Sequence, residues 1–199
     1  MDCHSICINN CTNIQAFASG CSGYTYSWSN GFPNGAGPYN ICPTSDTVFY
    51  VDVTEVSTGL VLRDTINIKV LNPTINPVSP LCNYSSPINL TAISMGGTWS
   101  GTGITNTSTG LFDPSIAGAG SHLITYQINS CQDTVFIEVT DPNAGSNRNW
   151  CASGIPRNLP NGLPVGGSWT GINVNSGTSQ FTPSTYGNFT AYYTFNGCL

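Results

Sequence analysis

Short runs in which apolar and polar residues alternate recur along the whole chain, and they predict β-strands. Two long runs, at 47–54 and 61–70, flank a turn at 57–59 and predict a hairpin with aromatic and β-branched faces. No segment repeats its apolar residues with the period of a helix. The pattern therefore predicts an all-β protein, with further strands at 13–18, 24–28, 88–93, 98–100, 110–113, 121–128 and 132–140.

The strand pattern is part of a longer repeat. The stretch GGTWSGTGITNTSTGLFDPS at 96–115 returns as GGSWTGINVNSGTSQFTPS at 166–184. A spacing of about 70 residues is too long for ankyrin or tetratricopeptide repeats and suits a small β-domain. Trp28, Trp99 and Trp169 recur once per unit, and we interpret them as the core tryptophans of three β-sandwiches.

Two stretches with the composition of linkers divide the chain. The first, 72–80, carries three prolines, and the second, 141–145, reads Asp-Pro-Asn-Ala-Gly. Tyr126 and Tyr193 each stand five residues before a cysteine, a placement similar to that in immunoglobulin-like sandwiches. We predict three tandem immunoglobulin-like domains of antiparallel β-sandwich type, at 1–71, 72–140 and 141–199. The third is expected to lack its last strand.

Composition limits the classes of partner. Charged residues make up 7% of the chain, against about 25% in ordinary soluble domains. Because Lys and Arg number only four and the net charge is −5, we exclude nucleic acid as a partner and direct membrane insertion or binding. Nine cysteines beside two histidines favour disulfides over zinc, and so an oxidising, extracellular compartment. The first residues lack the features of a signal peptide, so we expect a fragment of a larger exported protein.

Five cysteines occupy two repeat positions. Cys7, Cys82 and Cys151 precede the second strand of each unit, while Cys131 and Cys198 stand in the last hairpin turn. One hypothesis pairs them within units, as Cys82 with Cys131 and Cys151 with Cys198. In an immunoglobulin-like strand order, however, the two turns lie about 20 Å or more apart, whereas a disulfide needs Cα atoms within about 7 Å.

The alternative hypothesis pairs cysteines of successive units, as Cys7 with Cys131 and Cys82 with Cys198. It leaves Cys151 without a partner in the 199 residues, and an even number of cysteines inside the first unit, namely Cys3, Cys11, Cys21 and Cys42. The sequence leaves both schemes open. In either of them, these cysteines are structural rather than reactive.

Candidate sites for chemistry are few. His4 and His122 are the only histidines, and neither has neighbours spaced like a catalytic triad or a zinc site. The nine carboxylates are dispersed, which gives no support for a paired acid and base. We therefore predict no catalytic residue, no metal and no cofactor. Trp150, beside Cys151 and outside the tryptophan repeat, is the one candidate for stacking on a sugar ring, with packing at a domain junction as the alternative.

The sequence also resembles a known group of proteins. The second unit, GGTWSGTGITNTSTGLFDPSIAGAGSHLITYQI followed by CQDTVFIEV, resembles the immunoglobulin-like repeats of very large cell-surface adhesins of gliding Bacteroidota, of the gliding-motility (SprB-like) type. The first unit, with YSWSNG, SDTVFYVDV and DTINIKV, is similar to the PKD-like repeats of the same proteins, although its extra cysteines depart from their pattern. The resemblance implies a stalk segment that is exported by type IX secretion and displayed on the bacterial cell surface, with neighbouring repeats of the same long chain as its partners.

These observations give one main hypothesis and three rivals. The main one is a non-catalytic stalk of an adhesin, serving surface attachment and, in gliding cells, motility. The first rival is a carbohydrate-binding module that recognises surface polysaccharide or another glycan, and the second is a spacer in a secreted enzyme. The third is a subunit of an extracellular filament, completed by strand exchange.

Overall fold

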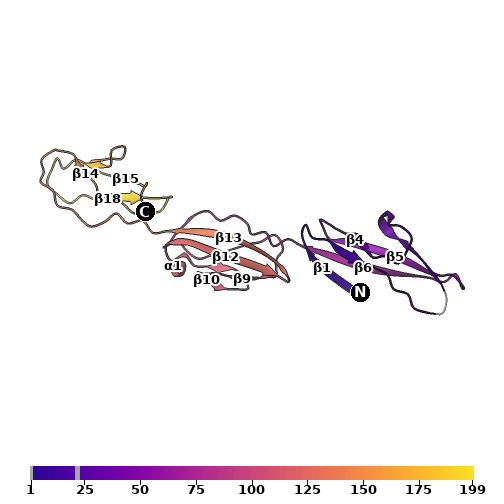
Figure 1. Ribbon diagram of the computed structural model, residues 1–199. Coiled ribbons are helices and arrows are strands. Elements are labelled where there is room, and N and C mark those ends of the chain that lie inside the picture. The colour runs from indigo at the N-terminus through magenta and orange to yellow at the C-terminus, as the bar shows by residue number, and fades with distance from the viewer. Residues whose placement is uncertain (1, 21–22) are drawn as a thin grey trace. The chain divides into compact units, whose positions relative to one another are not determined.

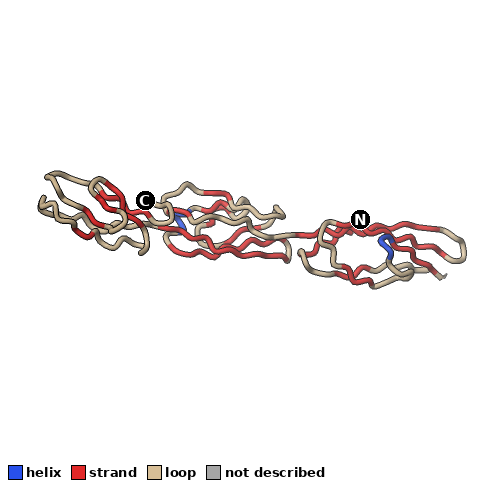
Figure 2. Tube along the Cα trace, turned by 90° about the horizontal axis from the view of Figure 1, so that it is seen from above, coloured by secondary structure: helices blue, strands red, loops and turns tan. Residues whose placement is uncertain are grey.

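The computed structural model describes residues 2–20 and 23–199 and confirms the all-β prediction (Figure 1). Strands run through the whole described chain, and loops connect them, with only two short helical turns (Figure 2). The chain forms two compact units. Unit 1 comprises 1–74, 92–97 and 127–133, and unit 2 comprises 75–91, 98–126 and 134–199. We keep the term repeat for the predicted ranges 1–71, 72–140 and 141–199, and this three-domain division stays a prediction.

The first repeat has a sheet of four strands and a sheet of two. The larger sheet has the order β1 (Asp2–Cys7), β6 (Val61–Leu71), β5 (Thr47–Glu55) and β3 (Tyr24–Trp28), and the smaller pairs β2 (Thr12–Ile14) with β4 (Tyr39–Ile41). The predicted hairpin is confirmed, because β5 pairs antiparallel with β6 from Thr47 opposite Ile68 to Thr54 opposite Val61. The 3-10 turn η1 (Ser29–Gly31) follows β3.

Two details of the first repeat differ from the sequence predictions. β1 pairs parallel with β6, with Cys7 opposite Leu71, so the sheet is mixed rather than purely antiparallel. The alternation at 13–18 gives a strand only as far as Ile14, because Ala16 leaves the ladder and its N–H donates to the Ala36 carbonyl instead (2.8 Å).

The core of the first repeat surrounds Trp28. Its indole N–H donates to the Gly35 carbonyl (2.8 Å), so burying the ring leaves no polar group unpaired. The Tyr39 ring meets the indole edge-on at 5.7 Å between centroids. Buried aliphatic and aromatic side chains from both sheets complete this core, namely Ile6, Ile14, Ile41, Phe49, Val51 and Ile68.

The second repeat has sheets of four and three strands. The larger has the order β7 (Leu81–Cys82), β13 (Cys131–Thr140), β12 (Gly120–Ile128) and β9 (Thr98–Ser100), and the smaller has β10 (Ile104–Asn106), β11 (Leu111–Phe112) and β8 (Ile88–Asn89). As in the first repeat, the first strand joins the last in parallel, with Cys82 opposite Thr140. The strand predicted at 88–93 is shorter, since β8 ends at Asn89.

One helical turn, α1 (Pro114–Ala117), was not predicted. The Asp113 carboxylate caps it by accepting hydrogen bonds from the Ser115 N–H (2.9 Å) and the Ser115 hydroxyl (2.6 Å). These bonds favour the ionised carboxylate and hold the Asp113 pKa below its ordinary value. A single turn of four residues is too short to show a helical period, so its signal was the Asp-Pro-Ser cap alone.

The third repeat has the same plan with fewer strands. A sheet of three, β14 (Arg157–Asn158), β17 (Gln180–Phe181) and β16 (Val174–Asn175), matches β8, β11 and β10 in order. A sheet of two, β15 (Ser168–Gly171) and β18 (Ala191–Thr194), matches β9 and β12. Among the described residues, no strand of this repeat corresponds to β7 or β13.

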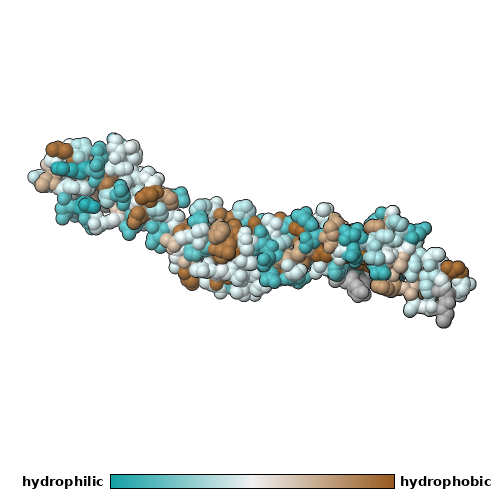
Figure 3. All heavy atoms as spheres, in the orientation of Figure 1, coloured by the Kyte–Doolittle hydropathy of each residue, from teal (hydrophilic) through white to brown (hydrophobic). Residues whose placement is uncertain are grey.

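The surface matches the composition. Figure 3 shows a face made mostly of pale and hydrophilic residues, on which apolar side chains form separate small groups. Such a surface carries few charges. Among the described residues the one ion pair is between the exposed Arg63 and the half-buried Asp52, whose atoms Nε and Oδ1 lie 2.7 Å apart. The Arg63 guanidinium lowers the pKa of the Asp52 carboxyl by hydrogen bonding to it.

Candidate functional site

The Cys7–Cys131 disulfide lies within unit 1 and joins residues 124 positions apart in the chain, with their Cα atoms at 5.4 Å. Cys7 is the last residue of β1, and Cys131 is the first residue of β13. The two strands belong to different repeats, so this bond joins the first repeat covalently to the hairpin turn of the second.

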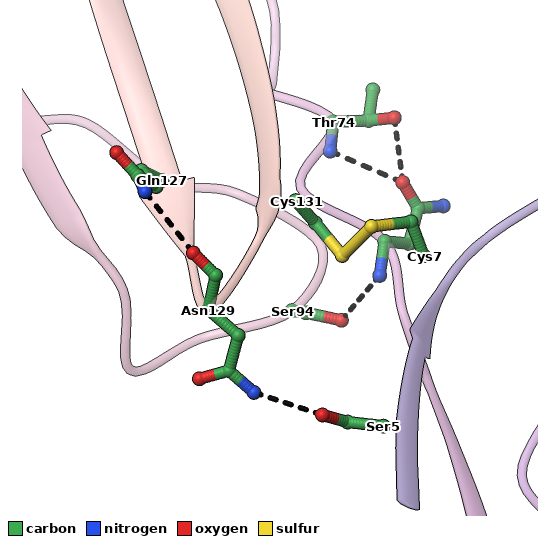
Figure 4. The surroundings of a disulfide bond; sticks show 8 residues. Ser5, Cys7, Thr74, Ser94, Gln127, Asn129 and Cys131 are labelled. Carbon is green, nitrogen blue, oxygen red and sulfur yellow. Dashed lines mark hydrogen bonds between the residues drawn. A yellow bond between two sulfur atoms is a disulfide. The ribbon is translucent and has the colours of Figure 1, made fainter.

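Hydrogen bonds surround this disulfide (Figure 4). The Asn129 side-chain amide donates to the Ser5 hydroxyl (3.0 Å), and the Gln127 amide donates to the Asn129 carbonyl (3.1 Å). The linker is held in the same way, because the Asn72 N–H donates to the Ser94 hydroxyl (2.9 Å) and the Ser94 N–H donates back to the Asn72 carbonyl (2.8 Å). Neutral amide and hydroxyl groups therefore hold the polypeptide around the sulfur atoms.

The Cys82–Cys198 disulfide lies within unit 2 and has the same construction. It joins residues 116 positions apart, with Cα atoms at 5.5 Å. Cys82 ends β7 as Cys7 ends β1, and each cysteine opens a turn closed by a hydrogen bond to its carbonyl, from the Asn10 N–H (3.0 Å) or the Ser85 N–H (2.9 Å). The Leu199 N–H donates to the Tyr84 hydroxyl (2.6 Å) beside the bond.

Of the two pairing schemes, the structure has the one between successive repeats. Pairing Cys82 with Cys131 is wrong because of the register of one strand. Cys131 begins β13, whereas Cys82 lies opposite Thr140, which ends it. Nine residues of extended strand separate these ends by about 30 Å, far beyond the reach of a disulfide. Pairing Cys151 with Cys198 is also wrong, since Cys198 is bonded to Cys82.

The other cysteines divide into three cases. Cys42 pairs with Cys11, across the sheet of β2 and β4 in the first repeat. Cys21 lies outside the described residues, and nothing is described of the Cys3 side chain. Cys151 is an exposed free thiol. Its repeat counterparts Cys7 and Cys82 are both disulfide-bonded, and three disulfides place the chain in an oxidising compartment.

Alkylation of the unreduced protein should therefore label Cys151, while Cys7, Cys82, Cys131 and Cys198 stay unlabelled. Accessible thiols react with maleimides or iodoacetamide and disulfides do not. Peptide mapping without reduction should then recover one cross-linked pair holding Cys7 and Cys131 and another holding Cys82 and Cys198. A peptide pair joining Cys82 to Cys131 would contradict this connectivity.

The repeated tryptophans lie in equivalent, buried places. Trp28 ends β3, and Trp99 and Trp169 lie on its counterparts β9 and β15. Each of the three is at most 7% exposed. Trp99 lies 4.5 Å from the ring of Tyr126, and Trp169 lies 5.3 Å from the ring of Tyr193, between centroids. Because the tyrosines stand on β12 and β18, each pair joins neighbouring strands inside a core.

Trp150 borders a hollow in the third repeat. The hollow has a volume of about 500 Å³ and is lined mainly by residues 144–150 and 185–191. The side chains of Trp169 and Phe181 also line it. Trp150 is half-buried and stacks on Phe181 at 5.6 Å, with 25° between the ring planes. One face of the indole is thus already covered by the protein. Sequence reasoning did not detect the hollow because its lining residues come from segments far apart in the chain.

The two histidines have structural neighbours. The Nε2 atom of His4 lies 3.2 Å from the Thr12 hydroxyl, and that of His122 lies 2.8 Å from the Gly118 carbonyl. In the described part of the chain, no three His, Cys, Asp or Glu side chains gather in a way that could hold a metal ion. The described helices are also too short to cross a membrane.

No protein-family model and no curated protein matches the sequence. Solved structures similar to the chain include the insect immune protein hemolin (13% identity, TM-score 0.35, 68% of this chain and 44% of hemolin). Drosophila N-cadherin EC1-4 is 13% identical, with a TM-score of 0.26, and the match covers 70% of this chain and 47% of the N-cadherin chain. The fibronectin(III)-like modules of Clostridium thermocellum CbhA are 13% identical, with a TM-score of 0.31, and the match covers 68% of this chain and 88% of the CbhA chain. The chain therefore spans less than half of the hemolin and N-cadherin structures.

Proposed function

We propose that this chain is a non-catalytic stalk segment of a large secreted adhesin, in which linked β-sandwich repeats hold a binding region away from a cell. The observation that carries the proposal is the overlap of the Cys7–Cys131 and Cys82–Cys198 disulfides, whose loops share residues 82–131. Each bond joins one repeat to the next, so a pulling force passes through covalent bonds as well as through packing. Such bonds serve a mechanical role and have no evident use in a catalytic domain.

Stability in this proposal comes from covalent bonds and core aromatic residues. A repeat of about 60 to 70 residues buries too little apolar surface to be strongly stable alone. In the chain-entropy model, closing a loop of the length between Cys7 and Cys131 contributes about 5 kcal/mol, although overlapping loops are not additive. Disulfides therefore supply the stability that small cores and a surface with few charges do not provide.

Sequencing the complete reading frame tests the proposal. We expect many further repeats, each with a tryptophan after a Gly-Gly pair and cysteines at the positions of Cys82 and Cys131. The sequence resemblance supports a bacterial cell surface, export by type IX secretion and, in a gliding cell, a part in motility. A single catalytic domain joined to these three repeats would instead make the chain an enzyme spacer and contradict the proposal.

A carbohydrate-binding module is the second candidate, because the hollow beside Trp150 has an aromatic lining. A sugar array with the purified protein separates the two functions. If the stalk proposal holds, no glycan is retained specifically, since Trp150 already stacks on Phe181. Retention of one glycan by the parent protein, lost in Trp150→Ala and kept in a variant of the exposed Tyr50, would favour the module.

A further inference from the structure

In the first and second repeats, the first strand pairs in parallel with the last. β1 pairs with β6 along its whole length, and both residues of β7 pair with β13. The residue after each strand extends the pairing in the same way. The Ile8 N–H donates to the Leu71 carbonyl (2.8 Å), and the Asn83 N–H donates to the Thr140 carbonyl (2.9 Å). The two repeats thus join their first and last strands by one arrangement.

A disulfide extends the first strand of each of these repeats into the next repeat. β1 ends at Cys7, which is bonded to Cys131 at the start of β13 (Figure 4). β7 ends at Cys82, which is bonded to Cys198, after β18. The covalent route from β1 therefore continues directly into the last strand of the second repeat and does not pass through residues 8–130.

These connections define two short covalent routes, which we call threads. The first thread comprises residues 1–7 and 131–141, joined by one disulfide, and the second comprises 61–82 and 198–199, joined by the other. The first repeat gives β1 to the first thread and β6 to the second, whereas the second repeat gives β13 to the first thread and β7 to the second. In each repeat, the parallel hydrogen bonds therefore join one thread to the other.

A force along one thread acts on a chain that is already mostly extended. A β-strand rises about 3.3 Å per residue, which is close to the limit of a fully extended chain. A thread can therefore lengthen little before its covalent bonds resist. The strands on neither thread lie inside the loops that the two disulfides close, so a force along one thread does not pull their ends apart. These strands are β2–β5, β8–β12 and β14–β18.

We propose that the two threads carry the tension in this chain, while the other strands of the repeats stay folded. Load passes from one thread to the other through the pairing of β1 with β6 and of β7 with β13. Because a force along these strands loads their parallel hydrogen bonds together, the pairing resists sliding. The proposal deepens the stalk function and rests on it, since a stalk is the protein that is loaded along its length.

Single-molecule pulling with both handles on one thread tests the proposal. The handles are attached through non-natural residues, so that no cysteine is added. Between residue 1 and Asp141, the oxidised protein should reach about 60 Å without unfolding steps, because the route holds about 17 residues. Replacing Cys7 and Cys131 by Ser should raise this length about sixfold, to about 370 Å, because the route then holds about 110 residues. Unfolding steps of the repeats should appear in this variant.

The second thread provides the reciprocal measurement. Ser57 lies in the exposed turn before β6, and a handle there is paired with one at residue 199. The parent protein should reach about 90 Å over about 27 residues, and replacing Cys82 and Cys198 by Ser should raise this to about 300 Å. Each double variant is the control for the other thread, whose length it should leave unchanged. These final lengths do not depend on whether a variant folds.

Handles at residues 1 and 199 lie on different threads. Between them, the parent protein should lengthen in steps as the paired strands of the two threads part. Unfolding steps in the parent with both handles on one thread would overturn the proposal, and so would a smooth extension between residues 1 and 199. A reading frame without further repeats would contradict the stalk function but would leave all these lengths unchanged, so the two failures are distinguishable.

Discussion

When the protein is pulled by its two ends, the oxidised chain should extend about 150 Å between Cys7 and Cys198, whereas a chain without the two long disulfides should extend about 540 Å. The extension is limited by the length of the shortest covalent route between Cys7 and Cys198. It passes from Cys7 to Cys11, across the Cys11–Cys42 bond, along the chain to Cys82 and across the bond to Cys198. This route holds about 44 residues, and an extended chain gives about 3.4 Å per residue.

The variants make the measurement specific. Replacing Cys7, Cys82, Cys131 and Cys198 by Ser leaves the Cys11–Cys42 bond as the one disulfide among the described residues, and the route grows to about 160 residues. Replacing only Cys82 and Cys198 leaves a route across the Cys7–Cys131 bond of about 67 residues, or about 230 Å. Replacing only Cys7 and Cys131 should leave the final extension unchanged, because the shortest route does not use their bond.

Single-molecule force spectroscopy with handles at residues 1 and 199 measures these lengths. The reading is the final extension of the unfolded chain, so it holds even for a variant that does not fold. An oxidised parent protein that extends as far as the quadruple variant would contradict the pairing. Equal lengths for the two double variants would show that at least one long disulfide joins other cysteines.

The sequence predicted those strands whose pattern is long and local. β5 and β6 show clear alternation around one turn, and their hairpin matched the prediction. β1 was missed because apolar and polar residues do not alternate regularly in Asp2–Cys7, which becomes a strand by parallel pairing with β6, about 60 residues away. The strand expected at 13–18 ended early because the chain turns toward Ala36. Where the local pattern was weak, contacts with residues far away in the chain thus decided whether a strand formed and where it ended.

The disulfides show the same limit. Repeat positions showed which cysteines are equivalent, but the choice between Cys131 and Cys198 as the partner of Cys82 depends on which end of β13 each residue meets. That register is a property of the folded sheet. The hollow beside Trp150 was also beyond the sequence, because the residues that line it come from segments far apart in the chain.

Replacing Trp99 by Ala should unfold the second repeat locally while the first repeat keeps its structure. Trp99 is 4% exposed, and its ring lies 4.5 Å from that of Tyr126 on β12. It also fits closely against Gly110, where a Cβ would lie 2.7 Å from the indole Nε1 and φ is +69°. Removing a buried Trp costs about 3 to 5 kcal/mol. A small domain has a total stability of about 5 to 15 kcal/mol, and a repeat of this size stands at the lower end.

Hydrogen exchange followed by mass spectrometry locates the effect. In Trp99→Ala, amides of β12 should exchange about 100-fold faster or more, while those of β5 and β6 should keep the parent rate, because their core is built around Trp28. The matched control is Phe136→Ala, an aromatic residue of the same repeat that is 63% exposed on β13. Its loss should cost no more than about 0.5 kcal/mol. Unchanged protection of β12 in Trp99→Ala would show that the disulfides hold this repeat without its tryptophan, and that the core contributes far less than its burial indicates.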